Sequence, residues 1–202
     1  MTPHDIDILE RQTVFRGYFR IDRYRLRHAT FAGGWTGEMV REVFERGHAV
    51  AVLLYDPDRD RVVLIEQFRI GAHAAGRQAW LLEVVAGIIG EGEAPEAVAH
   101  RETLEETGCV ATDLIPIADY LPSPGGSSET IGLYCARTDA RTAGGVHGLV
   151  HEHEDIRTVV MTTDEAIARL DAGTLDNSAI IIAIAWLARN RERLRRLWAT
   201  AG

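Results

Sequence analysis

Apolar residues fall into short blocks along the chain, and their spacing predicts the secondary structure. Residues 48–55 and 61–68 are nearly continuous apolar runs on either side of the turn sequence Asp-Pro-Asp-Arg-Asp. Continuous runs of this length are typical of strands covered on both faces, so the two runs predict a buried hairpin. Further strands are predicted at residues 39–44, 114–120, 130–136 and 157–161.

Three helices are predicted from the residues that start and stop them. Pro95 suits the first turn of a helix, and Gly108 suits the position after its last turn. A second helix is expected to start at Thr163 and to end before Gly173. The third covers residues 177–198, and its apolar first half is expected to pack against the rest of the chain.

A small β unit is predicted before Gly47, from alternation within residues 14–26 and a glycine-rich turn at 31–37. So short a unit buries little core alone. We therefore expect it to pack against the main domain or against a second subunit. The sequence divides into an N-terminal β domain, residues 1–47, which we expect to dimerise, and a main domain, residues 48–202.

Composition and charge narrow the possible partners and location. The 202 residues are 46% hydrophobic and 26% charged, as in soluble globular proteins. A net charge of −8 argues against nucleic acid or an anionic membrane as a partner. The longest apolar run, residues 179–188, is about half of the ~20 residues that span a bilayer, and the first residues lack the pattern of a signal peptide. Two cysteines without a metal or redox spacing complete the expectation of a cytoplasmic protein.

The first predicted helix concentrates acidic residues where a plain helix would avoid them. At about 100° per residue, Glu102 and Glu106 share one face, and Leu104 and Ala97 lie opposite and are expected to pack inward. Like charges four residues apart cost about 0.2–0.5 kcal/mol, and Glu105 and Glu106 in the last turn oppose the helix dipole. A divalent cation such as Mg²⁺ resolves the conflict because it prefers oxygen ligands.

The whole stretch from Gly87 to Cys109 resembles the Nudix box, Gly-x5-Glu-x7-Arg-Glu-U-x-Glu-Glu-x-Gly-U, in which U is a bulky apolar residue. Its fixed positions are matched by Gly87, Glu93, Arg101, Glu102, Glu105, Glu106 and Gly108, with Thr103 and Cys109 at the U positions. The resemblance implies an α/β fold, the Nudix α/β/α sandwich with a mixed sheet, plus the small N-terminal β-strand unit. It also implies hydrolysis of a nucleoside diphosphate linked to another moiety, with a divalent cation.

The resemblance assigns roles within the box and beside it. The implied metal ligands are Glu102, Glu106, Glu154 and the carbonyl of Ala86. Glu105 supports this cluster, and Arg101 orients a carboxylate, most simply that of Glu93 or Glu105. The alternative for Arg101 is a surface ion pair.

A later loop supplies the implied general base. Such a base must reach the attacking water yet stay free of the metal, which favours Glu152, on a loop that contains Gly144, Gly145 and Gly148. Two alternatives stay open at this point. The segment is a solvated acidic loop, or His151 and His153 hold a transition metal.

Residues outside the box resemble the ADP-ribose pyrophosphatase branch of the family. Pro124 follows Cys109 at the spacing that marks this branch, and the likeness continues from about Thr13 to the end of the chain. By position, the implied substrate contacts are Tyr18, Arg41, Arg69, Pro124 and Glu129. Tyr18 stands where an aromatic ring stacks on adenine, and Arg41 stands where an arginine reaches the site from a partner subunit.

The resemblance therefore implies a homodimeric enzyme that hydrolyses ADP-ribose to AMP and ribose 5-phosphate. Mg²⁺ is the expected cation, with Mn²⁺ or another divalent ion as alternatives. Another nucleoside diphosphate sugar, such as GDP-mannose, is the neighbouring possibility for the substrate. A non-catalytic ligand sensor on the same fold is a further alternative, which the presence of Glu102, Glu105 and Glu106 disfavours because such sensors typically lose these glutamates.

Overall fold

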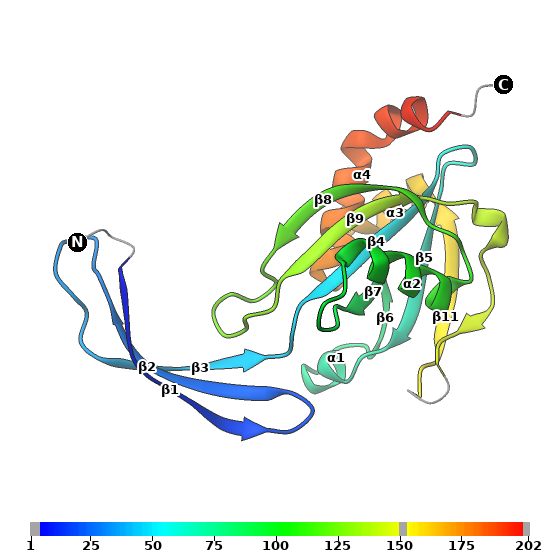
Figure 1. Cartoon of the computed structure of the whole chain (residues 1–202). Coiled ribbons are helices and arrows are strands. Elements are labelled where there is room, and N and C mark those ends of the chain that lie inside the picture. Colours follow the sequence, from blue (N-terminus) through cyan, green and yellow to red (C-terminus); the bar gives the residue numbers. More distant parts are fainter. Residues whose placement is uncertain (1–4, 150–152, 200–202) are drawn as a thin grey trace. The chain divides into compact units, whose positions relative to one another are not determined.

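The computed structural model describes residues 5–149 and 153–199 (Figure 1). By its internal contacts the chain forms two compact units, Met1–His48 with Leu121–Thr130 and Ala49–Tyr120 with Ile131–Gly202. The first unit thus includes a loop from much later in the chain. The division into domains 1–47 and 48–202, expected from the strand pattern before Gly47, stays a prediction.

The first unit is a three-stranded antiparallel sheet. Its strands β1 (Ile6–Arg16), β2 (Arg20–His28) and β3 (Met39–Glu45) lie in the order β1-β2-β3. Charged side chains pair across the strands, as Arg23 does with Glu42 at 2.8 Å. Within residues 5–48 and 121–130, Ala29 is the one buried hydrophobic residue, so the described part of this unit has no apolar core of its own.

The second unit is built on a mixed sheet. Its strands are β4 (Ala49–Asp56), β5 (Arg61–Phe68), β6 (Trp80–Glu83), β7 (Val85–Ile88), β8 (Thr112–Tyr120), β9 (Ile131–Arg137), β10 (Val146–His147) and β11 (Ile156–Thr162). They lie in the order β10-β11-β5-β4-β9-β8, with β6 beside β5 and β7 beside β4. β4 and β9 run parallel, whereas β4 and β5 run antiparallel. The predicted hairpin is confirmed, because β4 is buried along its whole length and β5 along most of its length.

Helices cover both faces of the mixed sheet. They are α1 (Ile70–Ala74), α2 (Pro95–Thr107), the 3₁₀ turn η1 (Ala140–Thr142), α3 (Thr163–Asp171) and α4 (Ser178–Leu197). Leu53 of β4 belongs to one core cluster with Ile184 of α4, and its neighbour Val52 belongs to a second cluster with Val98 of α2. Adjacent strand residues point to opposite faces, so the two clusters lie on the two sides of the sheet. The α/β/α sandwich is therefore confirmed, and Figure 1 shows α2 and α4 on opposite sides of the sheet.

Local sequence signals place most helix ends correctly. Gly108 ends α2 in the left-handed conformation, with φ at 68°. Asn177 caps α4, since its Oδ1 accepts a hydrogen bond from the backbone N–H of Ile180 at 3.1 Å. Helix α1 was not predicted, and it has no side-chain N-cap that would mark it. In the described ranges, no helix is long and apolar enough to cross a membrane.

Candidate active site

Helix α2 directs one of its glutamates into the interior of the second unit. Val98, Ala99, Thr103 and Thr107 are buried, and Glu106 lies among them with only 4% of its surface exposed. Thr103 is accommodated because its hydroxyl donates a hydrogen bond to the Ala99 carbonyl at 2.7 Å. The buried face of α2 is therefore made of small and β-branched residues together with a carboxylate.

The expectation that Leu104 and Ala97 pack inward was wrong. Leu104 is 57% exposed, and Ala97 is exposed as well. In the helix, Val98 and Ala99 lie on the same side as Glu102 and Glu106, and this side faces the sheet. The helix thus carries its acidic pair on the packed side, next to β7, and leaves the opposite side in solvent.

Glu106 is held by the backbone of β7. Its Oε2 accepts a hydrogen bond from the N–H of Ala86 at 3.2 Å. The pKa of Glu106 is raised to about 8, mainly by burial and also by the charges of Glu102 and Glu154, whereas the Ala86 hydrogen bond and the charge of Arg69 oppose the rise. The carboxylate form of Glu106 is consequently short of compensating positive charge.

Glu102 lies directly against Gly87. A Cβ atom at position 87 would stand 2.1 Å from Oε1 of Glu102, which is closer than any real contact, so the first glycine of the box is needed here for space. Burial raises the pKa of Glu102, the charge of Arg101 lowers it, and Glu105 and Glu154 add to the rise. Glu102 and Glu106 therefore share one acidic environment.

Arg101 connects the acidic residues of the box. Its Nη1 lies 2.9 Å from Oε1 of Glu102 and donates a hydrogen bond to Oε2 of Glu105 at 3.1 Å. Its Nη2 lies 3.7 Å from Oε2 of Glu93. Glu93 in turn accepts a hydrogen bond from the N–H of Gly90 at 2.8 Å, which ties the loop before α2 to the helix. The structure thus brings Arg101, Glu93, Glu102 and Glu105 together.

Glu154 approaches the same environment from the segment after β10. Its Oε2 accepts a hydrogen bond from the N–H of Leu149 at 3.0 Å. Its charge raises the pKa of both Glu102 and Glu106, which puts it within electrostatic reach of the helix. His151 and Glu152 lie outside the described residues. Within residues 5–149 and 153–199, no three His, Cys, Asp or Glu side chains converge in an arrangement ready to hold a metal ion.

Arg69, at the end of β5, is held by the buried carboxylate of Glu83. Nε and Nη2 of Arg69 donate hydrogen bonds to Oε2 of Glu83 at 3.1 and 2.8 Å. Gln67 donates to the same oxygen at 3.3 Å, and Asn177 donates to Oε1 at 3.3 Å. Arg69 is close enough to the acidic helix for its charge to lower the pKa of Glu106.

The other residues expected to contact substrate belong to the first unit. Tyr18 is 88% exposed and meets the ring of Phe19 edge-on, with centroids 4.7 Å apart. Glu129 is buried and pairs with Nε of Arg46 at 3.3 Å. Pro124 is exposed and occupies the turn Ser123–Ser127, in which the N–H of Ser127 donates to the Ser123 carbonyl at 2.9 Å.

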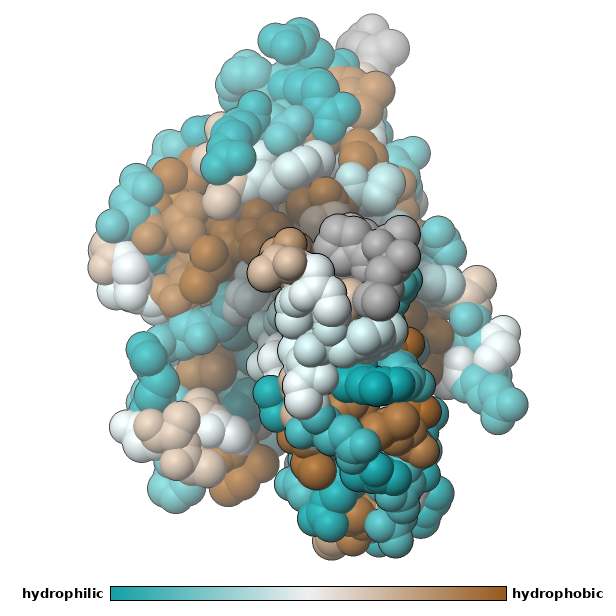
Figure 2. Space-filling view, turned by 90° about the vertical axis from the view of Figure 1, so that its left-hand side faces the viewer, coloured by the Kyte–Doolittle hydropathy of each residue, from teal (hydrophilic) through white to brown (hydrophobic). Residues whose placement is uncertain are grey.

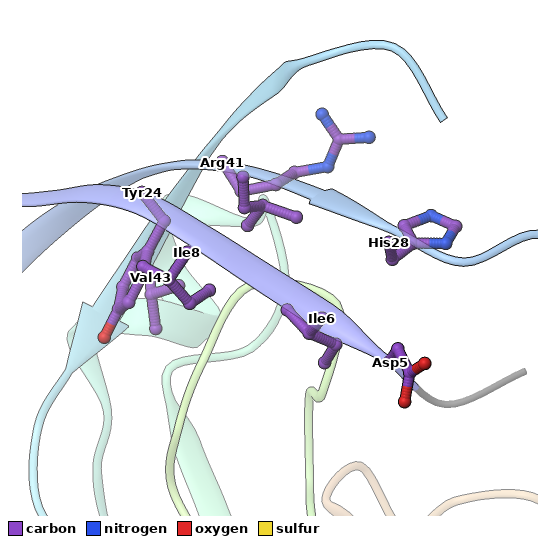
Figure 3. A pocket seen from close by; sticks show the side chains of 8 residues that line it. Asp5, Ile6, Ile8, Tyr24, His28, Arg41 and Val43 are labelled. Carbon is purple, nitrogen blue, oxygen red and sulfur yellow. The ribbon is translucent and has the colours of Figure 1, made fainter. Parts of the chain in front are cut away.

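Arg41 lies on β3 beside an apolar hollow of about 530 Å³ on the three-stranded sheet (Figure 3). The hollow is lined by Asp5, Ile6, Ile8, Tyr24, Leu26, His28, Arg41 and Val43. Nη1 of Arg41 donates a hydrogen bond to the carbonyl of Val40 at 2.8 Å. Figure 3 shows the Arg41 side chain extending away from Val43 and Tyr24.

Comparison with known proteins places the chain in a family. The NUDIX domain family matches residues 45–181, which include the whole acidic helix and both of its flanking strands. The chain belongs to the NUDIX family. Helix α2 and the strands beside it are thus part of a Nudix domain.

Several Nudix relatives resemble nearly the whole chain. The ADP-ribose pyrophosphatase of Escherichia coli K12 is 46% identical over 97% of this chain and 94% of its own length. The ADP-ribose pyrophosphatase of Haemophilus influenzae is 41% identical over 96% of this chain and 91% of its own. The GDP-mannose pyrophosphatase of Pectobacterium atrosepticum is 31% identical over 89% of this chain and 92% of its own.

One solved structure supports the fold. The crystal structure of an ADP compounds hydrolase superposes with a TM-score of 0.70 at 22% identity, covering 94% of this chain and 98% of that one. At this identity the likeness concerns the Nudix fold alone.

The sequence did not single out Glu83, which holds the expected substrate contact Arg69. Its signal was a lone acid inside the apolar run Trp80–Val85. A buried acid requires partners, but the sequence does not show that Arg69 and Asn177 supply them. Only the pairing of β5 with β6 and the packing of α4 bring these residues together.

Proposed function

We propose that this chain hydrolyses the pyrophosphate bond of ADP-ribose, yielding AMP and ribose 5-phosphate, with Mg²⁺. The observation that carries the proposal is the acidic environment on the packed side of α2, where Glu102 and Glu106 lie within reach of the charge of Glu154. The choice of ADP-ribose is supported by relatives named ADP-ribose pyrophosphatase that are 41–46% identical over at least 96% of this chain.

The residues present fit a divalent cation. Their donors are carboxylate oxygens, which suit Mg²⁺. Burial, together with the charges of Glu102 and Glu154, raises the pKa of Glu106, and a cation would compensate its carboxylate. Glu102, Glu106, Glu154 and the carbonyl of Ala86 are the residues that would hold it. When bound, a divalent cation neutralises phosphate oxygens and lowers the pKa of a bound water.

The remaining side chains orient charges and substrate. Arg101 holds Glu102 and Glu105 in place through an ion pair with each. Arg69 contributes positive charge beside the acidic helix, where the pyrophosphate of the substrate would add negative charge. Glu152 is proposed to accept the proton of the attacking water, whose oxygen forms a bond to one phosphorus while the bridging oxygen leaves with the other. Tyr18, Arg41, Pro124 and Glu129 are proposed to bind the nucleoside and ribose parts.

GDP-mannose is the second candidate substrate, favoured by the 31% identical relative that carries that name. A panel of nucleoside diphosphate sugars with identification of products separates the two candidates. We expect the kcat/KM for ADP-ribose to exceed that for GDP-mannose. The reverse order would replace ADP-ribose by GDP-mannose as the substrate.

We further propose that the protein works as a homodimer formed through its first unit. The described part of this unit has no apolar core, yet Ile6, Ile8 and Val40 are 65%, 49% and 51% exposed. Figure 2 shows hydrophobic patches that interrupt the hydrophilic surface of the molecule. A second copy of the chain would cover the hollow beside Arg41, and this would place Arg41 at the interface.

We propose a cytoplasmic location because the two cysteines are not joined in a disulfide. Cys109 and Cys135 are both buried free thiols. Burial raises the pKa of the Cys135 thiol far above its usual range, so this thiol is unreactive. Unpaired structural thiols are typical of a reducing compartment.

A further inference from the structure

Glu83 is a buried carboxylate whose hydrogen-bond partners come from two distant segments of the second unit. Only 9% of its surface is exposed. Gln67 and Arg69 approach its Oε2 from β5, and Asn177 approaches its Oε1 from the start of α4. A carboxylate in such a place requires compensation, and these donors supply it.

The side-chain amide of Asn177 makes hydrogen bonds in two directions. Its Oδ1 accepts the hydrogen bond that caps α4, from the N–H of Ile180 at 3.1 Å. Its Nδ2 donates to Oε1 of Glu83 at 3.3 Å and lies 3.4 Å from the carbonyl oxygen of Leu82. The orientation of the Glu83 carboxylate is thereby linked to the first turn of α4.

Glu83 holds only one edge of the Arg69 guanidinium. Nε and Nη2 both donate to Oε2 of Glu83 at 3.1 and 2.8 Å. No acceptor for Nη1 of Arg69 occurs among the described residues. Glu83 lies three residues before Ala86, whose N–H donates a hydrogen bond to Glu106 at 3.2 Å. The two hydrogen bonds to one oxygen of Glu83 orient the guanidinium of Arg69 and leave Nη1 available.

We propose that Glu83 and Asn177 are positioning residues. Through the two hydrogen bonds between Glu83 and Arg69, they direct Nη1 of Arg69 toward the pyrophosphate of the substrate. This inference rests on the proposed function, because it deepens the role of Arg69 in that site. Neither Glu83 nor Asn177 touches the reacting atoms. Their contribution is to present a charged donor in one fixed geometry, which reduces the entropy lost when the phosphates bind.

A purely structural role makes a different prediction for the same residues. If Glu83 and Asn177 only tie β6 to α4, their loss lowers stability and leaves the kinetics of the folded enzyme unchanged. If they position Arg69, their loss raises KM at unchanged fold and has no further effect once Arg69 is absent. A double-mutant cycle distinguishes the two roles.

The cycle uses Glu83→Gln and Arg69→Ala, singly and together, with ADP-ribose and Mg²⁺. Glu83→Gln keeps the size of the side chain but removes the negative charge that pairs with the guanidinium of Arg69. We expect kcat/KM to fall roughly 10- to 100-fold, mostly through KM. A methylene-bridged analogue of ADP-ribose should bind more weakly by a similar factor in calorimetry. In the Arg69→Ala background, Glu83→Gln should change kcat/KM less than about twofold.

Asn177→Ser supplies the second variant, and Thr162→Ala its control. Serine keeps the cap on α4 but removes the amide that donates to Glu83, so KM should rise while the fold is kept. Thr162 caps α3 through a capping box with Glu165, away from this network. Thr162→Ala should therefore lower the melting temperature at unchanged KM.

Two results would overturn the inference. In the first, the wild-type enzyme hydrolyses ADP-ribose, and Glu83→Gln and Asn177→Ser have the same KM as the wild type. This result would leave the proposed function intact. In the second, Glu83→Gln lowers kcat/KM by the same factor in the wild-type background and in the Arg69→Ala background. A wild-type protein that neither hydrolyses ADP-ribose nor binds the analogue would refute the proposed function, and this inference with it.

Discussion

A Cβ atom on Gly87 would lie 2.1 Å from Oε1 of Glu102, and within 2.3 Å of its Cγ and Cδ. The glycine therefore fixes where the Glu102 carboxylate can lie. Its φ is not in the left-handed region, so alanine at this position is tolerated by the backbone and acts on Glu102 alone.

We expect Gly87→Ala to displace Glu102 and to lower kcat by roughly 10²-fold or more, because a shift of about 1 Å in a positioned group costs that much. The melting temperature should change little. Gly37→Ala is the matched control, since a Cβ at Gly37 meets no atom within 4 Å. Near-normal turnover of Gly87→Ala would show that the position of Glu102 does not matter.

The metal-free protein should lose stability as pH rises from about 4.5 to about 8. Burial raises the pKa of Glu106 to about 8 in the folded chain, from 4.5 for an ordinary glutamate. Between these values the folded state binds more protons than the unfolded state, so the free energy of unfolding falls with rising pH, by at most about 1.4 kcal/mol per pH unit.

Urea unfolding in EDTA at several pH values measures this slope for the wild type and for Glu106→Gln. The variant lacks the titrating group, so its slope should be shallower and its stability at pH 8 should be higher. Saturating Mg²⁺ should restore the wild type at pH 8, because a cation that binds the folded state stabilises it. Equal slopes in the two proteins would contradict the assignment of the raised pKa to Glu106.

The dimer is tested at Ile8, which lines the hollow on the three-stranded sheet and is 49% exposed. We expect the wild type to sediment as a dimer at micromolar concentration and Ile8→Glu to sediment as a monomer with reduced activity. A buried charge at an apolar interface is strongly unfavourable. Phe31→Glu is the control, because Phe31 is 95% exposed and lies outside the hollow. A fully active wild-type monomer would exclude this interface.

The general base is tested by comparing Glu152 with Glu105. Glu152→Gln should lower kcat by roughly 10²–10⁴-fold with little change in affinity for ADP-ribose or Mg²⁺. Glu105 pairs with Arg101 at 3.1 Å, so Glu105→Gln should cost less in kcat. The opposite ranking of the two variants would place the base inside the box.

The parts of the fold that local sequence encodes were predictable. The hairpin of β4 and β5 follows from its apolar runs, and Gly108 and Asn177 mark helix ends because their own backbone and side chains form the caps. The grouping of Glu102, Glu105 and Glu106 on one helix was likewise predictable from their spacing.

The packing side of α2 and the environment of Arg69 were not predictable. Leu104 is the larger apolar residue, yet it is exposed, and the helix packs through Val98 and Thr103. Glu83 gains its function from contacts with β5 and α4, which are distant in sequence. Periodicity along one element carries no information on such contacts.

The central claim is that the acidic residues of α2 support hydrolysis of ADP-ribose. Its most direct test is incubation of the wild type and Glu106→Gln with ADP-ribose and Mg²⁺ in H₂¹⁸O, with products identified by mass spectrometry. We predict AMP and ribose 5-phosphate from the wild type, one of them carrying a single ¹⁸O, no products in EDTA, and a loss of most activity in Glu106→Gln with the fold intact. Absence of these products from the wild type, or near-normal turnover by Glu106→Gln at saturating Mg²⁺, would contradict the claim.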